Sequence, residues 1–106
     1  MRNTLLSFAL MALCAAAAAA PQHACAPAAL KQAGKLLAFH AGPDDRIEID
    51  TGVKVLAPLK NPAGKDKYDV LEVYGYIYKG TYRMHFIYAP AGCTLMGQEV
   101  LEIANL

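Results

Sequence analysis

Three tyrosines at alternate positions are the sequence feature best suited to chemistry. Tyr74, Tyr76 and Tyr78 recur at a spacing of two, and Arg83 and His85 follow within a few residues. Side chains two residues apart in a β-strand point to the same face of a sheet. Tyrosine offers a large rigid contact area with a polar tip, and arginine donates paired hydrogen bonds. The pattern predicts a binding face for a protein, a peptide or a glycan.

The competing interpretation of the same tyrosines is a plain sheet surface. Aromatic residues favour strands without any function, and Tyr–Arg pairs across strands stabilise a sheet surface by a few tenths of a kcal/mol each, roughly. Both interpretations place these side chains on a strand, and they differ in whether a partner contacts them.

Catalysis has little support in the sequence. The only serine, Ser7, lies in the leader, and no nucleophile, base and orienting acid form a recognisable motif. Glu72 is close enough in the predicted hairpin to pair with His85 diagonally, and such an ion pair is more often structural than catalytic. We therefore expect a non-enzymatic protein without a cofactor.

The spacing of histidines and cysteines does not suggest a metal site. His23, His40 and His85 share no short motif, and the cysteines are too far apart for a zinc signature. One exception depends on the cleavage site of the leader. Cleavage after Ala20 would make His23 the third residue of the mature chain, an arrangement that can chelate Cu(II).

The five candidate binding residues lie in a predicted β-hairpin over Leu71–Tyr88. A two-residue turn at Lys79-Gly80, of type I′, pairs Tyr76 with Arg83 and Tyr74 with His85. The opposite face is apolar and is the expected core: Leu71, Val73, Gly75, Ile77, Tyr82, Met84, Phe86 and Tyr88. A slip of one residue would bury Arg83 and His85, so burial favours these faces.

A short helix is predicted before the hairpin, over Ala28–Phe39. Leu30, Ala33 and Leu37 recur at spacings of three and four, which places them on one side. Gly42-Pro43 ends the helix. Such a short helix is stable only when its apolar side is packed, and the apolar side of the hairpin is the expected partner of Leu30 and Leu37.

Further strands are predicted on both sides of the hairpin. Arg46–Asp50 alternates apolar and polar residues, and Val53–Leu56 either continues that strand after a bulge or forms a second one. Cys93–Ile103 fits a strand or a short helix, and the strand is favoured because an antiparallel meander gives it a neighbour. The sum is an α+β fold: one N-terminal helix packed on an antiparallel sheet of about four strands.

The first twenty residues have the pattern of a cleaved signal peptide. A weakly cationic start is followed by an apolar run and then by small residues, Ala15–Ala20. The apolar run is too short for a comfortable membrane span, so we expect no stable membrane anchor. Residues 21–27 then form a tether and residues 28–106 a single domain, periplasmic or secreted in a bacterium.

Two cysteines remain after the leader, with Cys14, is removed. In an exported protein an even pair predicts a disulfide, here Cys25–Cys93, which staples the domain. The chain has 10 basic and 9 acidic residues, and losing Arg2 leaves nine of each. A neutral domain has no electrostatic footprint for nucleic acid.

Two functional classes follow from the sequence. The first is a small exported binding or accessory protein that uses Tyr74, Tyr76, Tyr78, Arg83 and His85 to bind a partner in the cell envelope. The alternative is a structural or envelope-maintenance protein that forms a homodimer and has no small-molecule ligand. The sequence leaves open whether the chain is a monomer or a homodimer.

Overall fold

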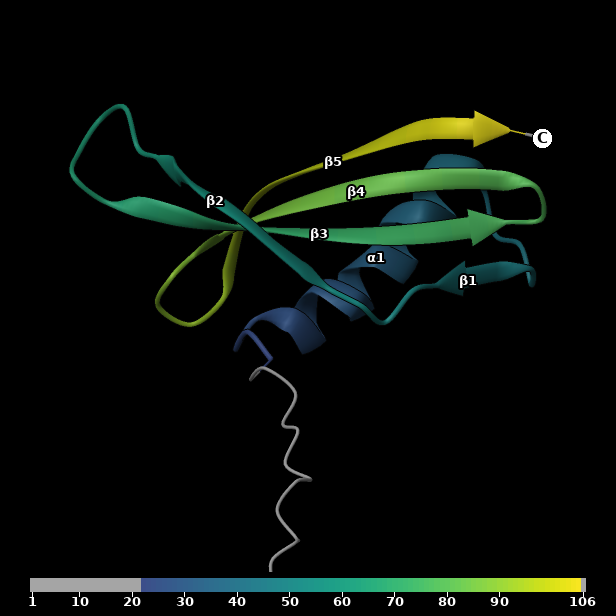
Figure 1. Ribbon diagram of the computed structural model, residues 1–106, viewed down its shortest axis with the longest axis horizontal. Helices are drawn as coiled ribbons and strands as arrows, with labels where there is room; N and C mark the ends of the chain where they lie inside the picture. The colour runs from purple at the N-terminus through teal and green to yellow at the C-terminus, as the bar shows by residue number, and fades with distance from the viewer. Residues whose placement is uncertain (1–21, 106) are drawn as a thin grey trace, which may run out of the picture.

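The computed structural model describes residues 22–105, and the predicted signal peptide lies outside them. One helix, α1 (Ala26–Ala41), precedes five strands, which are β1 (Ile47–Ile49), β2 (Lys54–Lys60), β3 (Lys67–Ile77), β4 (Gly80–Ala89) and β5 (Thr94–Asn105). The strands form one antiparallel sheet with α1 packed against one of its faces (Figure 1). The predicted α+β class is confirmed, with five strands in place of about four.

The central strand of the sheet is β3, which pairs with β4 on one side and with two short strands on the other. β1 runs beside the C-terminal half of β3, where Ile49 lies opposite Gly75, and β2 runs beside the N-terminal half, where Lys54 lies opposite Glu72. The chain between them leaves the ladder at a turn in which the Gly52 amide donates to the Asp50 carboxylate. The sequence left open whether residues 46–56 form one bulged strand or two strands. They contribute to two strands, β1 and β2, which follow one another along the same edge of β3.

The β2–β3 end of the sheet extends beyond the helix, as Figure 1 shows. Pro58 lies within β2, where the pairing with β3 shifts between Leu56 and Leu59. An edge strand tolerates proline because one side of it makes no ladder hydrogen bonds. Val55 and Leu59 of β2 are about half exposed.

Helix α1 starts at Ala26, two residues earlier than predicted, and has Pro27 in its first turn. Proline suits that position because the first amides of a helix have no partner within the helix. The buried side of the helix is mostly small: Ala26, Ala29, Ala33, Leu36 and Leu37. Leu37 and Ala33 are buried as predicted, Leu30 is only half-buried, and Leu36 adds to the predicted stripe.

The core lies between α1 and the face of the β3–β4 hairpin that was predicted to be apolar. Six side chains of that face are at most 9% exposed: Leu71, Val73, Tyr82, Met84, Phe86 and Tyr88. Gly75 lies on this face directly against Leu37 of the helix. A Cβ atom at this position would lie 2.8 Å from Leu37 Cδ2 and 3.0 Å from Met84 Cε. The absence of a side chain at Gly75 is what lets Leu37 reach the sheet.

The predicted position of the hairpin turn was wrong by one residue, and the register by two. Ile77 pairs with Gly80, so the two turn residues are Tyr78 and Lys79. A shift of two residues keeps each side chain on its predicted face. Gly80 is the first residue of β4 and not part of the turn. A Cβ atom at Gly80 would lie 3.1 Å from the Tyr82 ring, so a larger residue would be tightly packed there. Tyr78 takes the positive φ of the turn, 55°.

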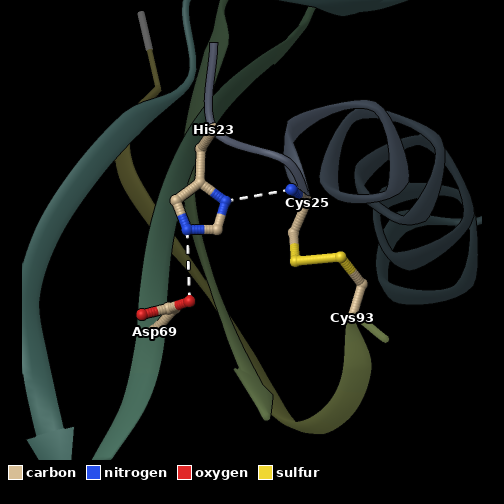
Figure 2. Close-up of a disulfide and its surroundings, with 4 residues drawn as sticks. All are labelled: His23, Cys25, Asp69 and Cys93. Carbon is tan, nitrogen blue, oxygen red and sulfur yellow. Dashed lines mark hydrogen bonds and ion pairs between the residues drawn. A yellow bond between two sulfur atoms is a disulfide. The ribbon is translucent and has the colours of Figure 1, made fainter. Parts of the chain in front are cut away.

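The predicted disulfide is confirmed: Cys25 and Cys93 are bonded, with their Cα atoms 5.5 Å apart. The bond joins the start of α1 to the turn between β4 and β5 (Figure 2). Cys25 is 1% exposed and belongs to the core cluster. The disulfide therefore fixes the helix to the hairpin side of the sheet.

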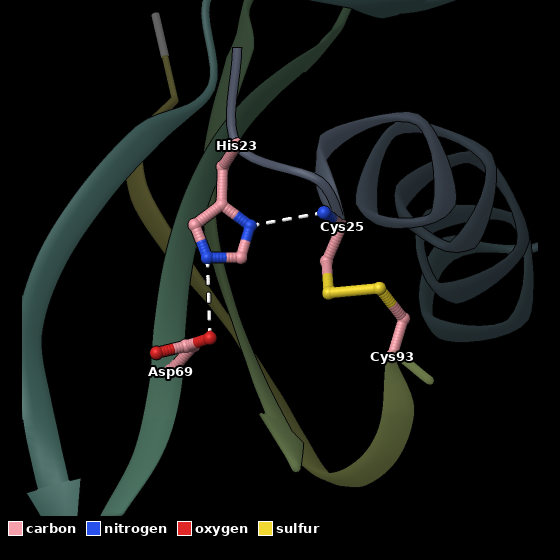
Figure 3. A network of polar contacts seen from close by, with 4 residues as sticks. All are labelled: His23, Cys25, Asp69 and Cys93. Atoms are coloured by element: carbon pink, nitrogen blue, oxygen red, sulfur yellow. Dashed lines mark hydrogen bonds and ion pairs between the residues drawn. A yellow bond between two sulfur atoms is a disulfide. The ribbon is translucent and has the colours of Figure 1, made fainter. Parts of the chain in front are cut away.

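The residues before α1 are held by His23, as Figure 3 shows. The backbone N–H of Cys25 donates to His23 Nδ1 at 2.9 Å, so the ring proton is on Nε2, which donates to the Asp69 carboxylate at 3.2 Å. The predicted loose tether is thus attached to β3. Chelation of Cu(II) through His23 Nδ1 would have to displace the Cys25 amide.

Between residues 22 and 105, no helix is both long enough and apolar enough to cross a membrane.

We predict that removing the disulfide is costly. The bond closes a loop with a sequence separation of 68, and the chain-entropy model assigns such a bond roughly 4 kcal/mol. Cys25→Ala/Cys93→Ala should lower the free energy of unfolding by that order of magnitude in urea denaturation. Equal stability of the variant and the oxidised wild type would contradict this role.

We also predict opposite effects for alanine at two glycines. Gly75→Ala should lower the free energy of unfolding by about 1–2 kcal/mol, because the new methyl overpacks the contact with Leu37. Gly34→Ala is the matched control in the middle of α1, where a Cβ has nothing within 4 Å. It should raise stability by about 0.5–1 kcal/mol. Thermal denaturation would show the prediction wrong if Gly75→Ala were also stabilising.

Candidate functional site

The sheet face opposite α1, called here the open face, carries the predicted binding residues. Within residues 22–105, no helix packs on this face. Tyr74, Tyr76, Arg83 and His85 all lie on it and are half-buried. Tyr78 lies in the turn at one end of the face and is 70% exposed. The structure therefore brings four of the five residues onto one face and places the fifth at its end.

The pairs across the β3–β4 hairpin differ from those predicted because the turn is displaced. Tyr74 lies opposite Arg83, and Tyr76 lies opposite Thr81. On its other side Arg83 lies opposite Leu101 of β5, which is half exposed. Arg83 therefore has an aromatic neighbour on one adjacent strand and an aliphatic neighbour on the other. Long basic side chains commonly pack their methylene groups against such neighbours and keep the charged end in water.

A row of titratable side chains crosses three strands of the open face. His85 Nε2 lies 2.8 Å from the Glu72 carboxylate on β3, and His85 Nδ1 lies 3.4 Å from the Glu99 carboxylate on β5. Glu72 is only 8% exposed. The pair of Glu72 and His85, predicted as diagonal, is directly opposite in the ladder. The contact of His85 with the second carboxylate, that of Glu99 on β5, was not predicted from the sequence.

The geometry of this row bears on what His85 can do. A general base needs a ring nitrogen within hydrogen-bond reach of the proton that it takes from the substrate. Both nitrogens of His85 face carboxylates of the protein. His85 therefore orders Glu72 and Glu99 on the open face, and neither of its ring nitrogens is directed at a ligand. Among residues 22–105, no group of three or more His, Cys, Asp or Glu side chains is arranged to hold a metal ion.

A shallow hollow of about 390 Å³ lies at the turn end of the open face. It is lined by Asp45, Arg46, Glu48, Tyr76 and Tyr78. The guanidinium of Arg46 lies over the Tyr78 ring, with its central carbon 5.2 Å from the ring centroid. Cations are attracted to the face of an aromatic ring at such distances. The tyrosine row thus ends in a concave, charged and aromatic surface.

Arg46 is held in place by Asp44. Its Nε and Nη2 donate to the two carboxylate oxygens of Asp44 at 3.0 and 2.9 Å. The guanidinium lowers the pKa of the Asp44 carboxyl from 3.8 to about 2, and in turn the pKa of Arg46 is raised. Since the carboxyl has a lowered pKa, the pair persists as pH falls and is lost only as pH approaches 2.

Sequence reasoning missed the residues that β1 brings to this hollow. The alternation of Ile47 and Ile49 with Glu48 indicates that Glu48 faces away from the core. It does not indicate that Glu48 lies opposite Tyr76. That placement depends on which edge of the hairpin β1 joins, and no residue type in the strand specifies the edge.

We predict that the row across the sheet is structural. His85→Leu leaves the carboxylate of Glu72 without its hydrogen-bond donor at an 8% exposed position. An unsatisfied buried polar group costs about 1–3 kcal/mol, so urea denaturation should show a loss of this order. Glu99→Gln is the control, with a side chain 68% exposed, and should change stability by less than about 0.5 kcal/mol. A neutral effect of His85→Leu would contradict this role.

Comparison with family models, curated proteins and solved structures gives no match to this chain. What the open face can bind is accordingly inferred from its own residues.

Proposed function

We propose that the protein is a small exported, non-enzymatic binding or accessory protein that recognises a protein, a peptide or a glycan through its open face. The contact residues are Tyr74, Tyr76 and Arg83, with Tyr78 at the end of the face. His85 acts by ordering the two carboxylates beside them. The periplasm of a bacterium is the proposed compartment.

The single observation that carries the proposal is the unequal treatment of the two sheet faces. Six apolar side chains of one face are packed under α1, whereas the tyrosines and Arg83 of the other face lie half-buried with no helix over them in the described part of the chain. Tyrosine and arginine are the residue types most enriched where protein interfaces gain their binding energy. The same residue types stack on sugar rings and donate to their hydroxyl groups.

Two observations support the absence of catalysis and the compartment. The one histidine on the open face has both ring nitrogens directed at protein carboxylates. The disulfide between Cys25 and Cys93 is typical of an oxidising compartment, and it agrees with the signal-peptide pattern of residues 1–20.

The test is capture of a partner by the immobilised mature protein from a solubilised envelope fraction. Tyr76→Ala/Arg83→Ala should abolish capture, because it removes the aromatic and the cationic contact from one face. Digestion of the fraction with a protease or with glycan hydrolases before capture distinguishes a protein or peptide partner from a glycan.

The matched control is Lys31→Ala, which removes an exposed cation from α1 and should leave capture unchanged. Thermal denaturation must show that Tyr76→Ala/Arg83→Ala is folded. Capture of the same material by the folded double variant, or none by the wild type above blank resin, would reject the proposed function.

A further inference from the structure

The two edges of the sheet differ in how well they are protected against pairing with another strand. One edge is formed by β1, which has three residues, and by β2, which contains Lys54, Pro58 and Lys60. Short strands, proline and lysine are the usual means of blocking an edge. The other edge is β5, with twelve residues and without proline, lysine or arginine. On its outer side β5 has no neighbour among the described strands.

The β5 edge also carries exposed apolar side chains. Met96, Leu101 and Ile103 are 45–52% exposed, and all three belong to β5. Met96 and Ile103 lie where the pairing of β5 with β4 shifts register. Between them, residues 97–102 form a regular stretch. A long strand edge with unpaired backbone groups is a template for another strand.

We propose that two copies of this chain pair through their β5 edges, antiparallel, about a two-fold axis near Val100. An axis perpendicular to the sheet keeps both helices on the same side of a continuous sheet. Opposed side chains then come from the same face, so the axis passes through a residue of β5 and not between two residues.

Charge excludes Glu99 and Glu102 as the axis residue, and a groove beside Gln98 favours Val100 among the others. An axis at Glu99 would place two carboxylates directly opposite each other, which is destabilising. An axis at Val100 places Glu99 opposite Leu101 of the second copy, and Gln98 opposite Glu102 of the second copy. Each carboxylate then faces an apolar or an amide group, and none faces another carboxylate.

A groove between α1 and β5 gives the second copy a complementary surface. It has a volume of about 290 Å³ and is lined by Gln32, Lys35, Leu36, Phe39 and Gln98. The amides of Gln32 and Gln98 are hydrogen-bonded at 3.0 Å. With Val100 on the axis, Glu102 of the second copy lies opposite Gln98 and reaches the groove beside Lys35. The same contact forms twice, as two-fold symmetry requires.

The arrangement also limits the assembly to two copies. Both β5 edges are used in the dimer, and the remaining edges carry Pro58 and the lysines of β2. The pairing covers part of Phe39, which is 87% exposed in the single chain. Both open faces then point to the same side of one ten-stranded sheet.

Sedimentation velocity of the mature, oxidised protein over a range of concentrations tests this dimer. Glu102→Lys and Lys35→Glu should each raise the dimer dissociation constant about tenfold, because each turns two attractive contacts into repulsive ones. The double variant Glu102→Lys/Lys35→Glu should restore it. Lys31→Glu, on α1 outside the groove, is the control for charge alone. Circular dichroism must show that every variant is folded.

The outcomes separate cleanly. A dimer that is weakened by each single change and restored by the double change supports the proposal. A monomer at concentrations up to about 1 mM, where even a weak interface would associate, overturns it. So does a dimer that ignores the charge exchange, since it must use another surface, and so does growth into larger assemblies. None of these results depends on whether the open face binds a partner.

Discussion

A single helix can cover only one face of this sheet, and most of the structure follows from that constraint. The apolar alternate residues of β3 and β4 are buried under α1, and the residues between them remain on the open face. Because side chains alternate along a strand, burying one set of hairpin residues under α1 places all the others on the open face. The covered face contributes the packing that stabilises the domain. The open face carries Tyr74, Tyr76, Arg83 and the row formed by Glu72, His85 and Glu99.

Close approach of α1 to the sheet depends on small residues and on the disulfide. Alanines line the buried side of the helix, and Gly75 gives Leu37 a place against β3. A core this small stabilises a domain only marginally, and the Cys25–Cys93 bond adds a constraint on the unfolded chain. His23 fixes the residues before the helix to β3 through Asp69. The helix packing, the disulfide and the His23 contacts therefore all lie away from the open face.

The sequence predicted the class of fold, the two faces of the hairpin and the disulfide, because alternation and an even cysteine pair each have one simple structural solution. It did not predict the register. The sequence Lys79-Gly80 is typical of a turn, but the turn is formed by Tyr78 and Lys79. Gly80 lies in β4 beside the Tyr82 ring, where a Cβ atom would be tightly packed. The residue that β1 contributes to the hollow was also not predicted. Glu48 lies near Tyr76 only because β1 joins the β3 edge, a tertiary choice that local residue patterns do not encode.

In the proposed function the partner contacts the open face and not the helix side. Hydroxyl-radical footprinting of the mature protein, with and without a solubilised envelope fraction, distinguishes these two sides. Tyr74 and Tyr76 should lose reactivity when the fraction is present, while His40, which is exposed on the helix side and lies outside the groove, keeps its own. Protection of His40 with no change at the two tyrosines would show that the partner contacts the helix side instead.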